Sequence, residues 1–475
     1  MSTEATAWMD TLWDPEARLL RTPRPADPPT HMVRETVWYA VGLLTRRSTG
    51  DLERATEALH AVLGHQYDVP GTVFHGTWRR SPDEADPGAE PVEWRDYDPN
   101  WREFIGTALL LILHHFETDL PADLVARIDS ALVLAAEGSV RRGVRPDYTN
   151  IAVMAAYLYD SVGRRFGLPP AMRAGESLAR RVHTLWSATT AFPEFNSPTY
   201  YGVDLYGLGL WGAASGSPVL WSLGTDMETA LWREIADRYH PGLRNIAGPY
   251  DRAYGMDMQQ YAALLGLWIG LVAGPDAAPL PSGGPEAAGH AHDWCFAPCF
   301  ALLGVVPPED VTARLGQDVV RPRYMATTIS ESPRRVATSW LGERLMIGAL
   351  DAAGEGTPWG DQHCPVTVHW RAPDGGPVRW LRAAPQSPVD AAVDRDGCLR
   401  LRIRSSEPVR FEVHTPGSAP AVLAPGHWRL PGLGVRAVES QECFDVRTTS
   451  SRDGTFVEYR PTEGAPTLSL RFLTS

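Results

Sequence analysis

Apolar residues recur at intervals of three and four along the first 274 residues, a period that predicts amphipathic helices. The helices that would begin at 100, 149, 198 and 257 start about fifty residues apart, as in a repeat of helical hairpins. The segments with this pattern are 33–47, 51–65, 100–116, 121–138, 149–167, 169–188, 198–215, 225–240 and 257–274. The first part of the chain is therefore predicted to be an incomplete ring of helix pairs.

The pattern changes after a stretch rich in Pro, Gly and Ala at 273–294. Apolar and polar residues then alternate in short segments separated by turns such as DGG and PG, which predicts antiparallel strands. These segments are 334–342, 344–350, 366–372, 378–384, 398–406, 409–415, 434–442, 444–450, 455–461 and 468–474. We expect two domains, an (α/α) helical domain over 1–285 and an antiparallel β-sandwich over 286–475.

Four turns of the predicted helical domain are unusually rich in functional groups. Segments 94–101, 145–150, 193–201 and 248–257 each hold a tyrosine and a carboxylate, and three of them hold an asparagine. If alternate helices form an inner ring, the turns that lead into them lie at the same mouth of the ring. The recurrence at equivalent repeat positions therefore predicts a binding site on that rim.

Each candidate residue also has a purely structural interpretation. Asn196 with Ser197 before Pro198 fits a helix cap, and Asp251 with Arg252 fits a structural ion pair. The candidate site residues are Asn150, Asn196, Trp101, Tyr200, Tyr201, Tyr250, Arg252 and Tyr254. His75 and His363 are two further candidates, which loops outside the four turns would bring to the site. His75 lies in the long connection 65–98, which we interpret either as a lid or as a surface loop.

Composition narrows the range of partners. A formal net charge of -13 on 475 residues argues against nucleic acid as a partner, since neutralising phosphates requires a basic face. Five scattered cysteines fit a protein whose thiols are reduced. Cys295 and Cys299 are spaced to meet on one face of a helix, but the sequence offers no two further ligands for a metal ion beside them. We therefore expect no metal or other cofactor. The acidic N-terminus and the short apolar runs predict a cytoplasmic protein that neither enters nor binds a membrane.

The order of the two predicted domains resembles that of the polysaccharide lyases, including the heparinase II/III-like and alginate-lyase-like proteins. Segments 146–160, 193–207 and 248–257 are similar to the motifs that present Asn, Tyr and Arg on the (α/α) toroid of that superfamily. The resemblance implies β-elimination on an acidic, uronate-containing sugar or oligosaccharide. In that reaction Asn150 and Asn196 would neutralise the substrate carboxylate.

The resemblance also assigns the proton transfers. Arg252 would lower the pKa of Tyr250 or Tyr254, and one of these two tyrosines would act as base and then as acid. The sequence departs from the pattern at Asn150, because many such lyases follow this asparagine with a histidine and here Ile151 stands in that place.

Other functions fit the same rim. A dehydratase or cyclase of specialised metabolism would use the same tyrosine and arginine on a substrate that is not a sugar. An inverting glycoside hydrolase would need two facing carboxyl groups, for which Glu194, Asp204, Asp251 and Asp257 are available. A carbohydrate-binding protein that lacks catalysis would explain the absent histidine. The sequence does not indicate an oligomeric state.

Overall fold

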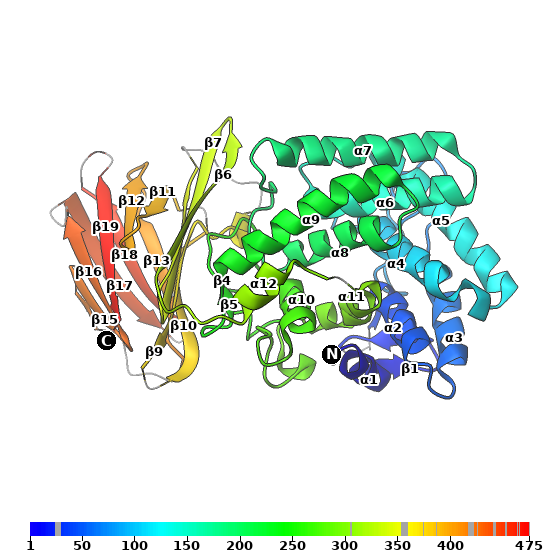
Figure 1. The fold of residues 1–475 in the computed structure, drawn as a ribbon, viewed down its shortest axis with the longest axis horizontal. Coiled ribbons are helices and arrows are strands. Elements are labelled where there is room, and N and C mark those ends of the chain that lie inside the picture. The colour runs from blue at the N-terminus through cyan, green and yellow to red at the C-terminus, as the bar shows by residue number, and fades with distance from the viewer. Residues whose placement is uncertain are drawn as a thin grey trace. The chain divides into compact units, whose positions relative to one another are not determined.

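The computed structural model describes the chain except 24–29, 305, 353–359, 374, 386, 417–421, 425, 440–442, 452–453, 463, 465 and 475. The described residues divide into two compact units (Figure 1). The first unit comprises Met1–Leu185, Tyr201–Thr229 and Gln260–Val306, and the second comprises Trp186–Tyr200, Ala230–Gln259 and Pro307–Ser475. The second unit therefore takes two segments from the predicted helical region in addition to the strands.

The first unit is built mainly from helices. They are α1 (Ser2–Leu12), α2 (Val33–Arg46), α3 (Asp51–Leu63), α4 (Trp101–Phe116), α5 (Ala122–Arg142), α6 (Thr149–Arg165), α7 (Pro169–Ser187), α8 (Tyr200–Ala213), α10 (Leu264–Ala273) and α11 (Ala297–Leu303). In α3 the buried positions Ala55, Ala58, Leu59 and Val62 form the one apolar face that the sequence pattern predicts. By contrast, α4 buries nearly every residue, as expected of an inner helix.

Two helices begin seven residues away from their predicted starts. Helix α10 begins at Leu264 rather than at 257, because the Asp257 side chain stabilises a turn instead. Its Oδ1 accepts hydrogen bonds from Asn245 Nδ2 at 2.9 Å and from the Gln259 backbone at 3.0 Å. Helix α9 (Pro218–Arg238) begins seven residues before its predicted start, and it runs from the first unit into the second.

The C-terminal strands form two antiparallel sheets. One sheet has the order β17-β18-β13-β10-β9-β8-β7-β6 and the other the order β11-β12-β19-β16-β15-β14. Their bounds are β6 (Arg323–Glu331), β7 (Arg334–Leu341), β8 (Leu345–Asp351), β9 (Val366–Ala372), β10 (Gly375–Ala383), β11 (Val389–Val393), β12 (Cys398–Ile403), β13 (Val409–His414), β14 (Val422–Ala424), β15 (His427–Leu430), β16 (Leu433–Glu439), β17 (Phe444–Ser451), β18 (Gly454–Pro461) and β19 (Thr467–Thr474). The predicted strand over 434–442 extends into 440–442, which lie outside the described residues.

The two sheets share one hydrophobic core. Ile347, Val368 and Leu381 of the first sheet belong to the same buried cluster as Leu401 and Leu470 of the second. In β12 buried and exposed residues alternate after the first two positions, so apolar side chains enter the core and the arginines between them face outward. The sequence-based prediction of helical hairpins followed by an antiparallel β-sandwich is confirmed.

Two segments from the region predicted to be helical pack on the eight-stranded sheet of the second unit. Phe195 lies in one buried cluster with Ile329 and Leu350, and Ala247 lies in another with Met346. The sheet is therefore a platform for segments 186–200 and 230–259, which contain two of the four polar turns. The predicted boundary at 285/286 stays a prediction, since neither compact unit is a continuous stretch of chain.

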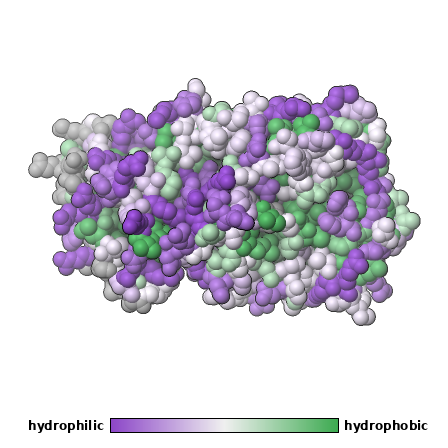
Figure 2. All heavy atoms as spheres, in the orientation of Figure 1, coloured by the Kyte–Doolittle hydropathy of each residue, from purple (hydrophilic) through white to green (hydrophobic). Residues whose placement is uncertain are grey.

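The face shown in Figure 2 carries many hydrophilic residues, with intermediate and hydrophobic residues between them. This distribution agrees with a charged chain of net charge -13. Across the described ranges, no helix combines the length and the hydrophobicity needed to cross a membrane.

Candidate active site

Three segments of the second unit are held together by backbone hydrogen bonds around Arg252. The amide of Asp251 donates to the Phe195 carbonyl at 3.1 Å, and the amide of Ala253 donates to the Gln362 carbonyl at 2.9 Å. Tyr250 and Cys364 exchange two further bonds, at 3.1 and 2.8 Å. The backbone of residue 252 is thus fixed between the turn at 193–201 and the segment before β9.

Asn196 and Ser197 connect the two polar turns. Asn196 has a left-handed backbone (φ 53°) and is fully buried, and its Nδ2 donates to the carbonyls of Ala247 at 2.7 Å and Pro249 at 2.9 Å. The Ser197 hydroxyl donates to the Arg252 carbonyl at 2.6 Å and accepts from the amide of Tyr200 at 3.1 Å, at the start of α8. The pair therefore positions both turns and caps the helix, as the structural interpretation of the sequence proposed.

The Arg252 guanidinium donates in three directions. Its NH1 pairs with Glu194 Oε1 at 2.7 Å, its NH2 donates to the Tyr200 hydroxyl at 2.6 Å, and its Nε donates to Gln362 Oε1 at 3.0 Å. The Glu194 side chain is fully buried, and that of Arg252 is only 10% exposed. A buried carboxylate thus compensates the charge of the guanidinium and fixes its orientation.

Tyr254 extends this chain of contacts toward solvent. Its hydroxyl lies 2.5 Å from the Tyr200 hydroxyl, and either oxygen can donate. Tyr254 is 36% exposed, whereas Tyr200 is half-buried beneath it and its ring lies 3.7 Å from the guanidinium carbon of Arg252. The series Glu194–Arg252–Tyr200–Tyr254, which we call the tyrosine–arginine relay, runs from a buried carboxylate to an exposed phenol.

Tyr250, the other tyrosine of this turn, has a different environment. It is 1% exposed, and its hydroxyl donates to the Ile246 carbonyl. A buried phenol committed to a backbone carbonyl is placed for packing rather than for contact with a substrate. Of the two tyrosines expected to act as base and acid, Tyr254 is therefore the one with an accessible hydroxyl.

A second polar group adjoins the relay. Asp251 Oδ1 pairs with Arg335 NH2 at 2.6 Å and lies 3.5 Å from His363 Nδ1. Burial lowers the pKa of the His363 imidazole, which the Asp251 carboxylate opposes and the Arg335 guanidinium reinforces. Within the described part of the chain, His363 Nδ1 and Asp251 Oδ2 have no hydrogen-bond partner. His363 is 7% exposed, so this loop histidine lies near the polar turn but is largely covered.

The remaining predicted site residues belong to the first unit. Asn150 and Tyr201 are fully buried, and Trp101 is buried with the Arg34 guanidinium 5.5 Å from its ring. His75 is 2% exposed, and its carbonyl accepts a hydrogen bond from Arg102 Nε at 3.0 Å. The part of the long connection around His75 is thus packed against α4. The roles of these four residues in binding or catalysis stay predictions.

The first unit has its own pair of joined polar turns. Asn100 Nδ2 donates to the Tyr148 hydroxyl at 2.9 Å, which connects turn 94–101 to turn 145–150. Arg142 NH1 donates to Asn100 Oδ1 at 2.8 Å. Turns separated by one repeat are therefore neighbours in this unit, as the spacing of the helices predicts.

Sequence reasoning gave no indication of the contributions of Arg335 and of the segment His290–Asp293. Arg335 stands at the start of a strand with nothing in the surrounding sequence to distinguish it from other surface arginines. His290, His292 and Asp293 are closely spaced in the sequence, and this spacing is the signal that could have identified them.

The family model described as "Domain of unknown function (DUF8769)" matches residues 1–305. The chain belongs to this family. The match ends before β6, so both sheets of the sandwich lie beyond it, whereas the polar turns of both units lie within it. No curated protein matches the sequence.

Two solved structures illustrate the similarity in fold. A chondroitin AC lyase of Streptomyces coelicolor A3, in complex with chondroitin sulphate, is 12% identical with a TM-score of 0.48, and the match covers 100% of this chain and 78% of that one. Heparinase III is 9% identical with a TM-score of 0.46, and the match covers 92% of this chain and 76% of that one. The resemblance to polysaccharide lyases concerns the fold, and at these values it carries no information on substrate or mechanism.

Proposed function

We propose that the chain is a carbon–oxygen lyase that cleaves an acidic, uronate-containing sugar or oligosaccharide by β-elimination, with Tyr254 as base and acid. The observation that carries the proposal is the tyrosine–arginine relay. It places a solvent-exposed hydroxyl 2.5 Å from a second hydroxyl, which in turn accepts from a guanidinium at 2.6 Å.

The relay favours loss of a proton from the tyrosine pair. An arginine can only donate, so the Tyr200 oxygen accepts from Arg252 and keeps its own hydrogen available for Tyr254. Once Tyr254 is a phenolate, Tyr200 donates to it, and the nearby positive charge stabilises the anion. Glu194 and Gln362 hold the guanidinium in place, so little reorganisation is needed when the phenolate forms.

Elimination then requires two proton transfers, and both involve the Tyr254 hydroxyl. The Tyr254 phenolate takes the C5 proton of the uronate, the bond from C4 to the glycosidic oxygen breaks, and the double bond forms between C4 and C5. The electron pair of the broken bond stays with the leaving oxygen, which receives the proton from Tyr254. The base is thereby regenerated. Such positioned proton transfer contributes roughly 10²–10⁴-fold to rate.

Asn196 takes a positioning role in this proposal. Both hydrogens of its amide are donated to the backbone carbonyls of Ala247 and Pro249, so neither is available for a substrate carboxylate. By holding these carbonyls it fixes the turn that carries Arg252 and Tyr254. The role of Asn150 in neutralising a carboxylate stays a prediction from the sequence, and its side chain is fully buried within the first unit.

Hydrolysis by paired carboxylates is less well supported. Of the four carboxylates considered, Glu194 pairs with Arg252, Asp251 pairs with Arg335, and Asp257 bonds to Asn245. These three and Asp204 are all buried. An inverting hydrolase needs two carboxyl groups that face the sugar and a water molecule, and the exposed functional group of the relay is a phenol instead.

The test is a panel of uronate-containing oligosaccharides incubated with the full chain and monitored for the ultraviolet absorbance of the unsaturated product. We expect the wild type to generate this absorbance and Tyr254→Phe to lose at least about a hundredfold in kcat/KM. Tyr324→Phe, a change of another partly exposed tyrosine in β6, is the matched control and should retain activity.

The same panel separates the alternatives. Reducing ends without new absorbance would indicate hydrolysis, and saturable binding without either product would indicate a carbohydrate-binding protein. If His363→Gln abolished turnover while Tyr254→Phe left it unchanged, the assignment of the base to Tyr254 would be wrong.

A further inference from the structure

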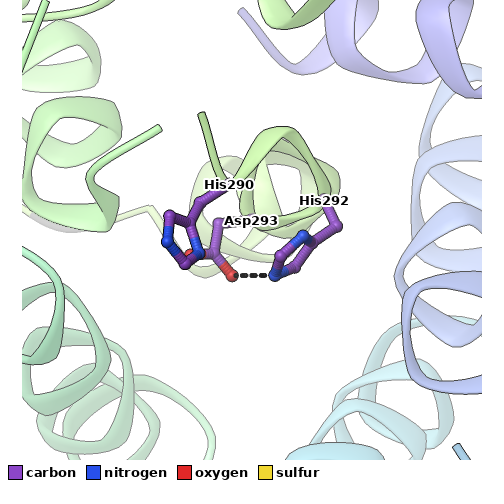
Figure 3. Close-up of side chains that lie close together, drawn as sticks. All are labelled: His290, His292 and Asp293. Atoms are coloured by element: carbon purple, nitrogen blue, oxygen red, sulfur yellow. Dashed lines mark ion pairs between the residues drawn. The ribbon is translucent and has the colours of Figure 1, made fainter. Parts of the chain in front are cut away.

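His290, His292 and Asp293 form a cluster of ligating side chains in the first unit, with no part in the proposed reaction. One ligand atom from each residue lies within 4.8 Å of the others, and Figure 3 shows the three side chains at one end of a short 3-10 helix. That helix spans Ala291–Phe296, and His292 Nε2 lies 3.6 Å from Asp293 Oδ1. We propose that these three residues bind a divalent transition-metal ion, with zinc preferred.

Backbone hydrogen bonds fix the residue before the cluster and the turn within it. The amide of Gly289 donates to the Gln260 carbonyl at 3.0 Å, and its carbonyl accepts from the amide of Ala262 at 2.8 Å. His290 follows with a left-handed backbone (φ 51°), and its carbonyl accepts from the amide of Asp293 at 2.9 Å. A left-handed residue just before a 3-10 turn brings position 290 onto the same side as 292 and 293.

The three residues differ in exposure in a way that suits a metal site. Asp293 is 7% exposed, and the side chains of His292 and His290 are both more exposed than that of Asp293. The carboxylate is thus held in a fixed position by its surroundings, whereas the imidazoles remain reachable from solvent. An ion can enter without unfolding of the chain, and a position facing water stays open for a further ligand.

The Arg34 guanidinium is a positive charge close to the cluster, and it repels a cation bound there. Its NH2 lies 4.0 Å from Asp293 Oδ1. However, the guanidinium is bound more closely by Glu35, whose Oε1 accepts from Nε at 3.1 Å and from NH2 at 2.6 Å. Counting Glu35, Arg34 and Asp293 as one group gives a formal charge of −1 with neutral imidazoles. The local charge therefore favours a cation, and Arg34 helps to orient the carboxylate.

The donor set indicates the class of metal. Two imidazole nitrogens and one carboxylate oxygen suit zinc and similar first-row ions, whereas calcium and magnesium prefer oxygen ligands throughout. Three protein ligands with an open fourth position are typical of zinc sites that bind a water molecule or substrate group.

A simple ion pair is the competing explanation. His292 and Asp293 at 3.6 Å fit such a pair, which would account for two of the three side chains. The His290 ring also lies beside the rings of Tyr261, at 6.4 Å between centroids, and His292, at 5.7 Å, and these contacts keep its ligand atom within 4.8 Å of the other two. A common bound ion would use the same convergence of all three.

The experiment uses the full chain purified without a histidine tag, stripped with chelator and dialysed. Zinc chloride is then titrated by calorimetry, and metal content is measured after removal of excess ion. We expect one zinc per chain, and at least about a hundredfold weaker binding in the double variant His290→Ala/His292→Ala, since even loss of an outer partner typically costs 10–100-fold. His427→Ala, which removes an exposed histidine of β15, should bind as the wild type does.

A second readout guards against a folding defect in the double variant. Asp293→Asn keeps the size of the side chain and removes its charge, and it should weaken zinc binding while leaving the far-ultraviolet circular dichroism unchanged. Failure of the wild type to bind zinc saturably, or equal binding in the wild type and both variants, would overturn the proposal. Neither result depends on turnover of a sugar, so the lyase proposal is tested separately.

Discussion

Arg252 donates from NH2 to the Tyr200 hydroxyl at 2.6 Å while its NH1 is paired with Glu194 at 2.7 Å. One guanidinium therefore links a fully buried carboxylate to a phenol that leads toward solvent. The same contact serves stability and the proposed chemistry, so substitutions around it should affect the two properties in different proportions.

Removal of Arg252 should destabilise the fold as well as abolish activity. In Arg252→Ala the buried Glu194 loses its charge partner, and we expect the free energy of unfolding to fall by about 3–5 kcal/mol. Chemical denaturation followed by tryptophan fluorescence measures the loss, with Arg321→Ala, a change of an exposed arginine, as control. In Arg252→Met/Glu194→Gln the unpaired charge is absent, so part of the stability should return. A double variant no more stable than Arg252→Ala would show that the ion pair is not the cause.

The two tyrosines of the relay should act as one unit. Tyr200→Phe removes the donor to Tyr254, and we expect kcat to fall roughly tenfold to a hundredfold with little change in KM. Tyr254→Phe should have the larger effect, and the double variant should resemble Tyr254→Phe alone, because Tyr200 has no phenolate left to stabilise. Strictly additive losses in kcat would mean that the two hydroxyls act independently.

Acid should destabilise the second unit through His369. This imidazole is fully buried, its Nε2 lies 2.6 Å from the Met256 carbonyl, and burial lowers its pKa from 6.5 to about 4. Between these values the unfolded chain binds the proton and the folded chain does not. The contribution of His369 is therefore complete above about pH 6.5 and is lost as the pH falls, by roughly 3 kcal/mol in total by pH 4.

The measurement compares denaturation midpoints at pH 7 and pH 4.5. The variant His369→Gln keeps an N–H donor for the Met256 carbonyl but does not titrate, so its stability should change less over this range than that of the wild type. Identical pH dependence in the two proteins would assign the acid sensitivity to other groups. His363 and His240 are the first alternatives, since burial also lowers their pKa values.

Gly348 in β8 should tolerate no side chain. A Cβ at this position would lie 2.0 Å from the carbonyl carbon of Gly248 and 2.1 Å from its oxygen, which are backbone atoms that cannot rotate away. We expect Gly348→Ala to lower the free energy of unfolding by about 1–3 kcal/mol or more. Gly434→Ala in β16 is the matched control, because its nearest neighbour would lie at 3.7 Å. Equal stability of the two variants would contradict the close approach of Gly248 to β8.

Local patterns in the sequence predicted most of the architecture. The period of three and four along 51–65 matches the buried face of α3, and the alternation along 398–406 matches β12. Such signals are local because helix and strand faces repeat within a few residues. Helix α1 and strands β6, β11, β14 and β15 were not predicted; the strands β14 and β15 span only three and four residues, too short for a clear period.

The candidate site was predictable only in part, because its contacts join distant segments. The turn containing Arg252 could be selected for its density of polar groups. Its partners could not, since Glu194 is 58 residues away and Gln362 is 110 residues away. Tyr250 and Tyr254 differ in whether the hydroxyl donates to a backbone carbonyl, and the local sequence pattern does not predict this difference.

The scattered origin of the second unit has a consequence for how the protein is made. At a synthesis rate of about 5–20 residues per second, Arg252 leaves the ribosome roughly 5–20 s before Gln362. For most of that interval Phe195 and Ala247 have no complete sheet to cover them, because β6 to β8 emerge only shortly before Gln362. The nascent chain therefore presents an unfinished apolar surface for seconds, long enough for a chaperone to shield it or for neighbouring chains to aggregate on it.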